Sequence, residues 1–199
     1  MSAQTVFTRY LKRDEEKQLL SHVGQFSDLL AKRDHAWMRL LRHTGIRVGS
    51  MAAISLGDAR DAVARQRLSL HRVKGGGRHE VPLNRDARKA IADLIRIRRE
   101  QGHPAIPDEP LVMSRKHRGL SVRSYQARMK RWIEAAGLDI AATPHWFRHT
   151  LAKRIVAQST AQNPLGIVQG ALGHRSAQST AVYTKPDRED IERAMEEAR

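Results

Sequence analysis

The sequence predicts a mainly α-helical protein with a small antiparallel β-sheet, an α+β fold. Apolar residues recur at helical spacing through most of the chain. Only residues 67–83 show short apolar runs around a glycine-rich turn, as two strands do. The chain has 199 residues, 40% of them hydrophobic. This length fits one ordinary domain, or two very small ones, with a sizeable core.

The first third of the chain is expected to consist of helices. Acidic residues followed by apolar residues at helical spacing predict a first helix over residues 14–23. Residues 35–43 repeat this pattern before Gly45, a residue type that favours a helix end. Residues 48–56 predict a third, short helix.

The middle of the chain combines a hairpin with a long helix. Residues 67–83 predict two short strands, with the glycine run 75–77 at their turn. Asn84 is a candidate N-cap for a long helix that ends by Gly102. Residues 102–110 contain three prolines and predict a long surface loop.

Helix starts are also marked in the last third of the chain. Residues 121–136 have a helical pattern. Thr143-Pro144 and Asn163-Pro164 each place a capping residue before a proline, which is well suited to the first helical position. Each pair therefore predicts the start of a further helix.

The C-terminal end is predicted to carry two short helices. Gly173 stops the preceding helix, and residues 176–183 begin another. Asp187 can cap a final helix. The narrow apolar stripe of that helix consists of Ile191, Ala194 and Met195. We therefore expect one domain over residues 1–186 and a helix over residues 187–199 that docks on something, in cis or in trans.

The amino-acid composition limits which kinds of partner and which cell compartment we expect for this chain. Lys and Arg number 36 against 21 Asp and Glu, a formal net charge of +15. A charge this high makes nucleic acid the leading partner, although ribosomal and membrane-surface proteins share it. The chain has no cysteine, which excludes disulfides and thiolate metal sites. With no secretory signal and no apolar stretch near 18 residues, we expect a cytoplasmic protein that does not enter a membrane.

Six residues of chemically useful type stand in short ordered motifs. They are Arg47, Lys74, His145, Arg148, His174 and Tyr183. Lys74 lies eight positions before Pro82, and Tyr183 lies nine after His174. With these spacings, the set resembles the tyrosine recombinase family over about residues 11–185. The resemblance implies the family's catalytic-domain fold, which is mostly helical with a small three-stranded sheet.

The resemblance also implies an activity, site-specific DNA recombination. Metal-free cleavage of a phosphodiester needs a nucleophile, cations on the non-bridging oxygens and a proton for the departing 5′ oxygen. Tyr183 is the candidate nucleophile, and Arg47 and Arg148 supply charge that favours its phenolate. By resemblance, Lys74 is the general acid, His145 assists proton transfer, and His174 donates to the phosphate. A 3′-phosphotyrosyl link conserves the bond energy, so no cofactor and no metal are implied.

Simpler interpretations apply to each motif taken alone. His145 and His149 have the spacing of a zinc-binding helix, but Trp146 stands where a metalloprotease has glutamate. The glycine run 75–77 lacks the lysine and hydroxyl residue of a phosphate-binding loop. Tyr183 by itself would most often be a packing residue. The ordered set, rather than any one motif, carries the prediction.

DNA contacts outside the site are predicted at a basic cluster. Arg115, Lys116 and Arg118 precede the helix over residues 121–136, and the cluster either grips the phosphate backbone or is an ordinary solvated loop. The expected partners are a double-stranded DNA recombination site and further copies of this chain, which assemble into a tetramer on the DNA. An accessory DNA-bending or clamp-domain protein is a further possible partner.

Two features differ from the family pattern. Ser50 stands where many relatives have an acidic residue, and residues 141–144 lack the usual additional histidine. About ten residues precede the first helix, so we expect the N-terminal core-binding domain of larger relatives to be absent.

Three functional interpretations remain open from the sequence. The preferred one is a recombinase of integrase, resolvase or invertase type. The second is a DNA-binding regulator or directionality partner that keeps the fold without strand exchange. The third is a type IB-like topoisomerase.

Overall fold

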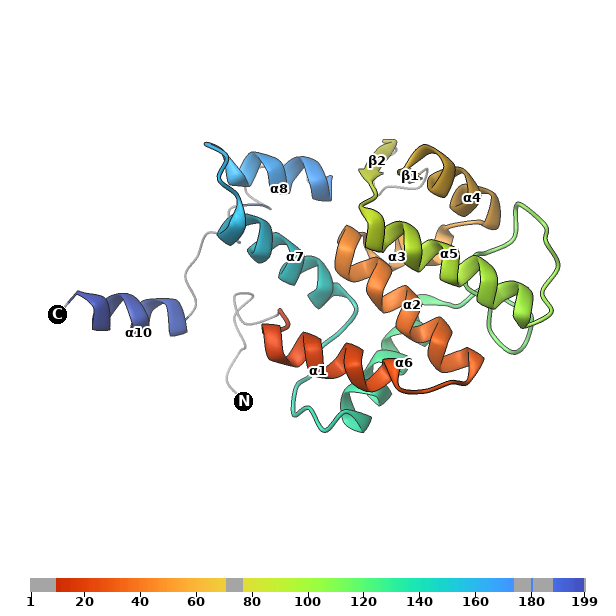
Figure 1. The fold of residues 1–199 in the computed structure, drawn as a ribbon, viewed down its shortest axis with the longest axis horizontal. Helices are drawn as coiled ribbons and strands as arrows, with labels where there is room; N and C mark the ends of the chain where they lie inside the picture. The colour runs from red at the N-terminus through yellow and green to blue at the C-terminus, as the bar shows by residue number, and fades with distance from the viewer. Residues whose placement is uncertain (1–9, 71–76, 174–179, 181–187, 199) are drawn as a thin grey trace.

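The computed structural model describes residues 10–70, 77–173, 180 and 188–198 (Figure 1). The helices in chain order are α1 (Arg13–Gly24), α2 (Leu29–Thr44), α3 (Val48–Ala53), α4 (Leu56–Arg65), α5 (Arg85–Glu100), α6 (Val122–Ala135), α7 (His145–Gln158), α8 (Pro164–Leu172) and α10 (Arg188–Glu197). The strands are β1 (Arg67–Leu70) and β2 (His79–Pro82). The predicted class, mainly helical with a small antiparallel sheet, is confirmed.

Helix α2 is the centre of the hydrophobic core. Asp28 caps it by accepting from the backbone N–H groups of Leu30 and Ala31, at 3.0 Å each. Its residues Trp37, Met38, Leu40 and Leu41 are fully buried. The helix packs most extensively against α5 and also contacts α1 and α7, as Figure 1 shows. Burial of these side chains, with the rest of the hydrophobic core, stabilises the fold.

The two strands form an antiparallel hairpin. Leu68 pairs with Val81, and both side chains are buried against the helices. The last registered pair before the connecting segment is Leu70 with His79. The described residues thus form two strands, whereas the resemblance implies three.

A smaller apolar cluster joins α7 to α8. Ala152 of α7 packs against Val168 and Leu172 of α8. Asn163 caps α8 by accepting from the N–H of Gly166 at 2.8 Å, and Gly173 ends it with φ of +63°. Both of these helix boundaries were predicted. Helix α10 lies apart from the other helices in Figure 1.

The sequence prediction missed one helix. Residues 48–56 were expected to form a single helix, but α3 ends at Ala53 and α4 begins at Leu56. Ser55 separates them by forming a capping box with Asp58, in which each side chain bonds to the other residue's N–H. Helix α2 also begins after a capping residue, Asp28. It therefore starts at Leu29, six residues before the expected start at residue 35.

The start of α7 also differs from the prediction. Thr143 was expected to cap it with Pro144 inside, but the helix begins at His145, Pro144 is the N-cap residue, and no side chain caps the end. The predicted helix over residues 176–183 and the predicted cap Asp187 lie outside the described residues, apart from the single helical position 180. Among the described helices, none is long and apolar enough to span a membrane.

Candidate active site

Arg148 is the residue around which the candidate site is built. It lies one turn into α7 with only 3% of its surface exposed. Its Nη1 donates to the carbonyl of Gly45 at 2.8 Å, and its Nη2 donates to the carbonyl of Leu172 at 2.7 Å. One guanidinium therefore ties the turn after α2 to the end of α8, two segments that are far apart in sequence.

Gly45 allows these segments to approach closely. Its φ of +59° is a left-handed conformation, and it ends α2. A Cβ atom at this position would lie 2.6 Å from a side-chain carbon of Leu172 and 3.0 Å from one of Leu151. Glycine is required here both by the backbone conformation and by the lack of space.

Arg47 follows this turn and has a different environment. It is the N-cap residue of α3, and its side chain makes no capping hydrogen bond. Unlike Arg148, it is exposed. The structure thus brings together two of the predicted arginines, one fixed by backbone carbonyls and one reaching into solvent, where a phosphate could contact it.

His145 completes the described part of the site. It opens α7 three residues before Arg148, so the two lie on neighbouring positions of one helix face. Desolvation lowers the pKa of His145, and the positive charges of Arg148 and Arg47 lower it further. Its ring packs edge-to-face on His149, with 4.6 Å between centroids. The shift favours the uncharged imidazole, the form that can accept or relay a proton.

Three predicted catalytic residues, Lys74, His174 and Tyr183, lie outside the described residues. Their roles stay predictions. Two of them are close in sequence to residues that the structure describes. Gly77 lies three residues after Lys74, and Gly173 directly precedes His174.

The predicted DNA-binding cluster is exposed but lies elsewhere. Arg115, Lys116 and Arg118 occupy a tight turn closed by the hydrogen bond from the N–H of Ser114 to the carbonyl of Arg118, at 2.8 Å. Arg33, near the start of α2, holds the base of this turn by donating to the carbonyl of Met113.

Gly45 and Arg47 follow the opposite end of α2. A helix of 16 residues spans about 24 Å. The basic cluster is therefore separate from the arginine pair.

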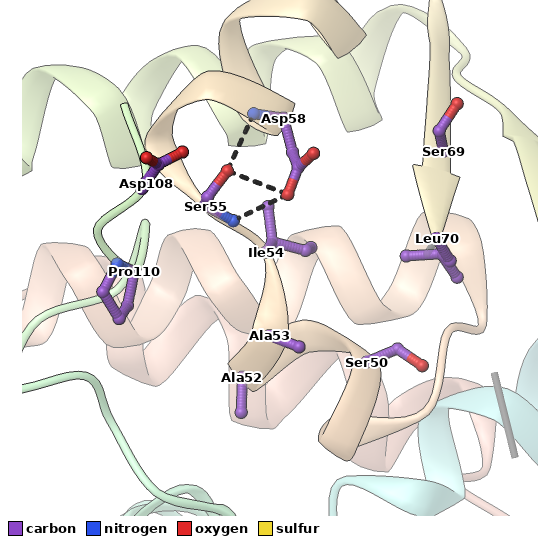
Figure 2. A pocket seen from close by; sticks show the side chains of 10 residues that line it. All are labelled: Ser50, Ala52, Ala53, Ile54, Ser55, Asp58, Ser69, Leu70, Asp108 and Pro110. Atoms are coloured by element: carbon purple, nitrogen blue, oxygen red, sulfur yellow. Dashed lines mark hydrogen bonds between the residues drawn. The ribbon is translucent and has the colours of Figure 1, made fainter. Parts of the chain in front are cut away.

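A pocket of about 430 Å³ lies beside α3, but its chemistry does not suit a phosphate (Figure 2). Its described lining includes two carboxylates, Asp58 and Asp108, and none of the three predicted catalytic residues that the structure describes, Arg47, His145 and Arg148. Figure 2 shows that Ser55 and Asp58 are engaged with each other in the capping box of α4. The structure thus indicates the Arg148 region, rather than this pocket, as the candidate site.

Sequence reasoning missed one residue next to the site, His79. It begins β2, and its ring contacts the end of α8 near Gly173. No sequence motif marks it, because its partners lie more than 90 residues away on the chain.

Comparisons with known proteins agree on a family. The model of the phage integrase family matches residues 9–190. The tyrosine recombinase XerC of Shewanella amazonensis is 36% identical over 162 residues, covering 80% of this chain and 51% of the relative. The XerC of Shewanella oneidensis is 33% identical over 198 residues, covering 94% of this chain and 59% of the relative. The chain thus spans between half and three fifths of these relatives.

Solved structures share the fold. XerA recombinase superposes with a TM-score of 0.78 at 21% identity, over 100% of this chain and 66% of that one. XerH recombinase bound to its difH substrate gives 0.71 at 21% identity, over 95% and 54%. A lambda integrase tetramer bound to a Holliday junction gives 0.62 at 20% identity, over 90% and 50%. With the fold, the family match and the arginine pair in agreement, this chain belongs to the phage integrase family of tyrosine recombinases.

Proposed function

We propose that the chain is the catalytic part of a site-specific DNA recombinase. It cleaves and rejoins DNA strands through a 3′-phosphotyrosyl intermediate on Tyr183. The observation that carries this proposal is the junction at Arg148, which brings Arg47 and His145 beside a guanidinium fixed by two backbone carbonyls.

The arginine pair suits a transition state with developing negative charge. Arg148 is held in place before substrate arrives, so little reorganisation is needed when charge develops on the non-bridging oxygens. Arg47 supplies a second guanidinium from the exposed side. Lysine could not replace Arg47 or Arg148, because only the planar guanidinium group can bind two oxygen atoms in one plane.

The proposed reaction is a transesterification. The Tyr183 phenolate attacks phosphorus, the bond from phosphorus to O5′ breaks, and Lys74 donates a proton to the departing oxygen. The uncharged imidazole of His145 relays protons within the site. The reverse reaction with the 5′ hydroxyl of another strand completes the exchange, so atoms and charge balance without a cofactor.

The proposed partners follow the same reasoning. The net charge of +15 favours duplex DNA as the substrate, and exchange between two duplexes requires four active sites, hence a tetramer. Solved structures of XerH with difH and of the lambda integrase tetramer provide precedents in the fold. Exchange of chromosomal or mobile-element DNA would take place in the cytoplasm, with an accessory DNA-bending or clamp protein as a possible further partner.

Helix α10 is the proposed contact between protomers. Its apolar residues Ile191 and Met195 are 48% and 70% exposed. We expect removal of residues 187–199 to reduce recombination more than binding to a single site. Equal loss of both would contradict docking in trans.

The test compares wild-type protein with Tyr183→Phe on DNA from the flanks of the gene, with EDTA present. Both proteins should bind, and only the wild type should form an SDS-resistant, protease-sensitive adduct. A regulator would show no difference between the two proteins. A topoisomerase would relax supercoiled plasmid lacking the site, which a recombinase should not do at comparable concentrations.

A further inference from the structure

His79 occupies the end of the hairpin nearest the connecting segment. It is half-buried, and its pairing partner Leu70 is the last registered residue of β1. Its Nε2 lies 3.3 Å from the carbonyl oxygen of Ala171 in α8. Because a carbonyl oxygen only accepts, Nε2 must carry the proton in this hydrogen bond.

The face of the His79 ring lies against Gly173. A Cβ added to Gly173 would lie 3.0 Å from three ring atoms, Cγ, Cδ2 and Cε1. Gly173 also has a φ of +63°, which residues with a side chain rarely adopt. The ring therefore fits this turn only because glycine occupies it.

The same turn is also held by Arg148. Its Nη2 donates to the carbonyl of Leu172, the residue between the two that His79 contacts. The hairpin, the end of α8 and the turn at Gly45 are thus joined through two side chains, His79 and Arg148.

We propose that His79 is a positioning residue that fixes the β1–β2 hairpin to the C-terminal turn of α8. The inference rests on the proposed function. In the sequence, Lys74 precedes His79 by five residues and His174 directly follows Gly173. A fixed distance between hairpin and turn sets where the general acid is delivered relative to the phosphate-binding groups.

The position of Lys74 matters because the rate of proton transfer depends steeply on geometry. A general acid must come within hydrogen-bond reach of the leaving oxygen. Misplacement by about 1 Å can cost roughly 100-fold in rate. His79→Ala removes the contact with α8 and leaves the buried core untouched, so we expect cleavage to fall about 10- to 100-fold while DNA binding is unchanged.

A substrate with sulfur in place of the 5′-bridging oxygen separates positioning of the acid from other defects. A thiol has a pKa of about 8.5, so a thiolate leaves without a proton. We expect the sulfur substrate to restore cleavage by His79→Ala, and equally by Lys74→Ala. Arg47→Ala should stay defective on both substrates, because it lacks a phosphate contact.

Two variants on the hairpin serve as controls. Glu80→Ala changes the next, exposed residue of β2 and should cleave both substrates at the wild-type rate. His79→Gln can still donate to the Ala171 carbonyl and should recover part of the lost rate.

The outcomes are distinguishable. If the wild type cleaves neither substrate, the proposed function itself fails. If the wild type cleaves and His79→Ala is equally fast on the oxygen substrate, or remains slow on the sulfur substrate, the positioning role is overturned. If the sulfur substrate does not restore cleavage by Lys74→Ala, Lys74 is not the general acid. The positioning role of His79 is then overturned as well.

Discussion

The two arginines of the candidate site occupy opposite environments. Arg148 is buried and bonded to two backbone carbonyls, whereas Arg47 is exposed at the start of a short helix. We therefore expect Arg148 to contribute to stability as well as to the proposed site, and Arg47 to contribute to the proposed site alone. Sequence motifs select both residues but cannot separate these roles, because burial depends on segments distant in the chain.

Arg148→Ala should destabilise the protein, whereas Arg47→Ala should not. Loss of the buried guanidinium leaves two carbonyl oxygens without this donor, which lowers the free energy of unfolding by about 2 to 4 kcal/mol. Arg47→Ala should stay within about 0.5 kcal/mol of wild type. Urea denaturation followed by circular dichroism measures both, and covalent adduct formation should be lost in both variants. Equal stability of the two variants would contradict the structural role of Arg148.

The pKa of His145 should respond to its charged neighbour. Desolvation lowers this pKa, with Arg148 and Arg47 adding to the effect. Arg47→Gln removes one positive charge, so the pKa should rise, whereas Arg47→Lys should leave it nearly unchanged. NMR titration of the imidazole measures the shift. An unchanged pKa in Arg47→Gln would mean that the two side chains do not interact.

The sign of the associated stability change follows from linkage. In the folded protein His145 binds a proton less readily than in the unfolded chain. Its contribution to stability is therefore complete above its unfolded pKa of about 6.5 and is lost as the pH falls below it. The same direction holds for His35, His43 and His103, whose pKa values are also lowered mainly by desolvation.

Among the elements, α2 and α6 are joined by a buried carboxylate. Asp34 is fully buried and accepts from Arg33 and from the indole N–H of Trp37 at 3.1 Å. Its second oxygen accepts from two α6 residues, Arg128 and Trp132. Two cations and two indole donors thus compensate one desolvated charge, which makes the pairing of these helices specific.

Asp34→Asn should destabilise the protein by about 3 kcal/mol or more, because buried arginine would lose its counter-charge. Asp93→Asn is the matched control. Asp93 also pairs with two arginines, Arg39 and Arg96, but its side chain is 24% exposed, so its loss should cost less than about 1 kcal/mol. Similar losses in the two variants would contradict the importance of burial at Asp34.

Local signals explain which elements could be predicted from the sequence. Asn84 and Asn163 cap α5 and α8 as expected, because a capping residue acts on N–H groups two or three positions away. The boundary between α3 and α4 was missed because residues 48–56 also fit one continuous helical pattern. The Asp34 cluster could not be predicted, since its α6 partners lie 94 and 98 residues away. His79 was missed for the same reason.

For the whole molecule, the net charge of +15 predicts that binding to the proposed DNA partner weakens as the salt concentration rises. Each neutralised phosphate contributes about 0.9 to the slope of log K against log salt concentration. Replacing Arg115, Lys116 and Arg118 by Ala should reduce that slope by roughly 2 to 3 if all three contact phosphates. Titrations at several salt concentrations measure the slope with one duplex.

A charge-matched variant controls for the loss of net charge. Arg13, Lys17 and Lys130 are exposed on α1 and α6, and their replacement by Ala removes the same charge from other elements. This control should change the slope by much less than the first variant. Equal changes in the two variants would mean that the basic cluster acts only through the overall field and makes no local contact.

Identification of the covalent residue is the most direct measurement of the proposed chemistry. Wild-type protein is incubated with a nicked duplex site in EDTA, the adduct is digested, and the peptide that carries a nucleotide remnant is identified by mass spectrometry. The expected result is a phosphodiester on Tyr183 that is absent from Tyr183→Phe. A remnant on another residue, or an adduct that persists in Tyr183→Phe, would contradict the phosphotyrosyl mechanism.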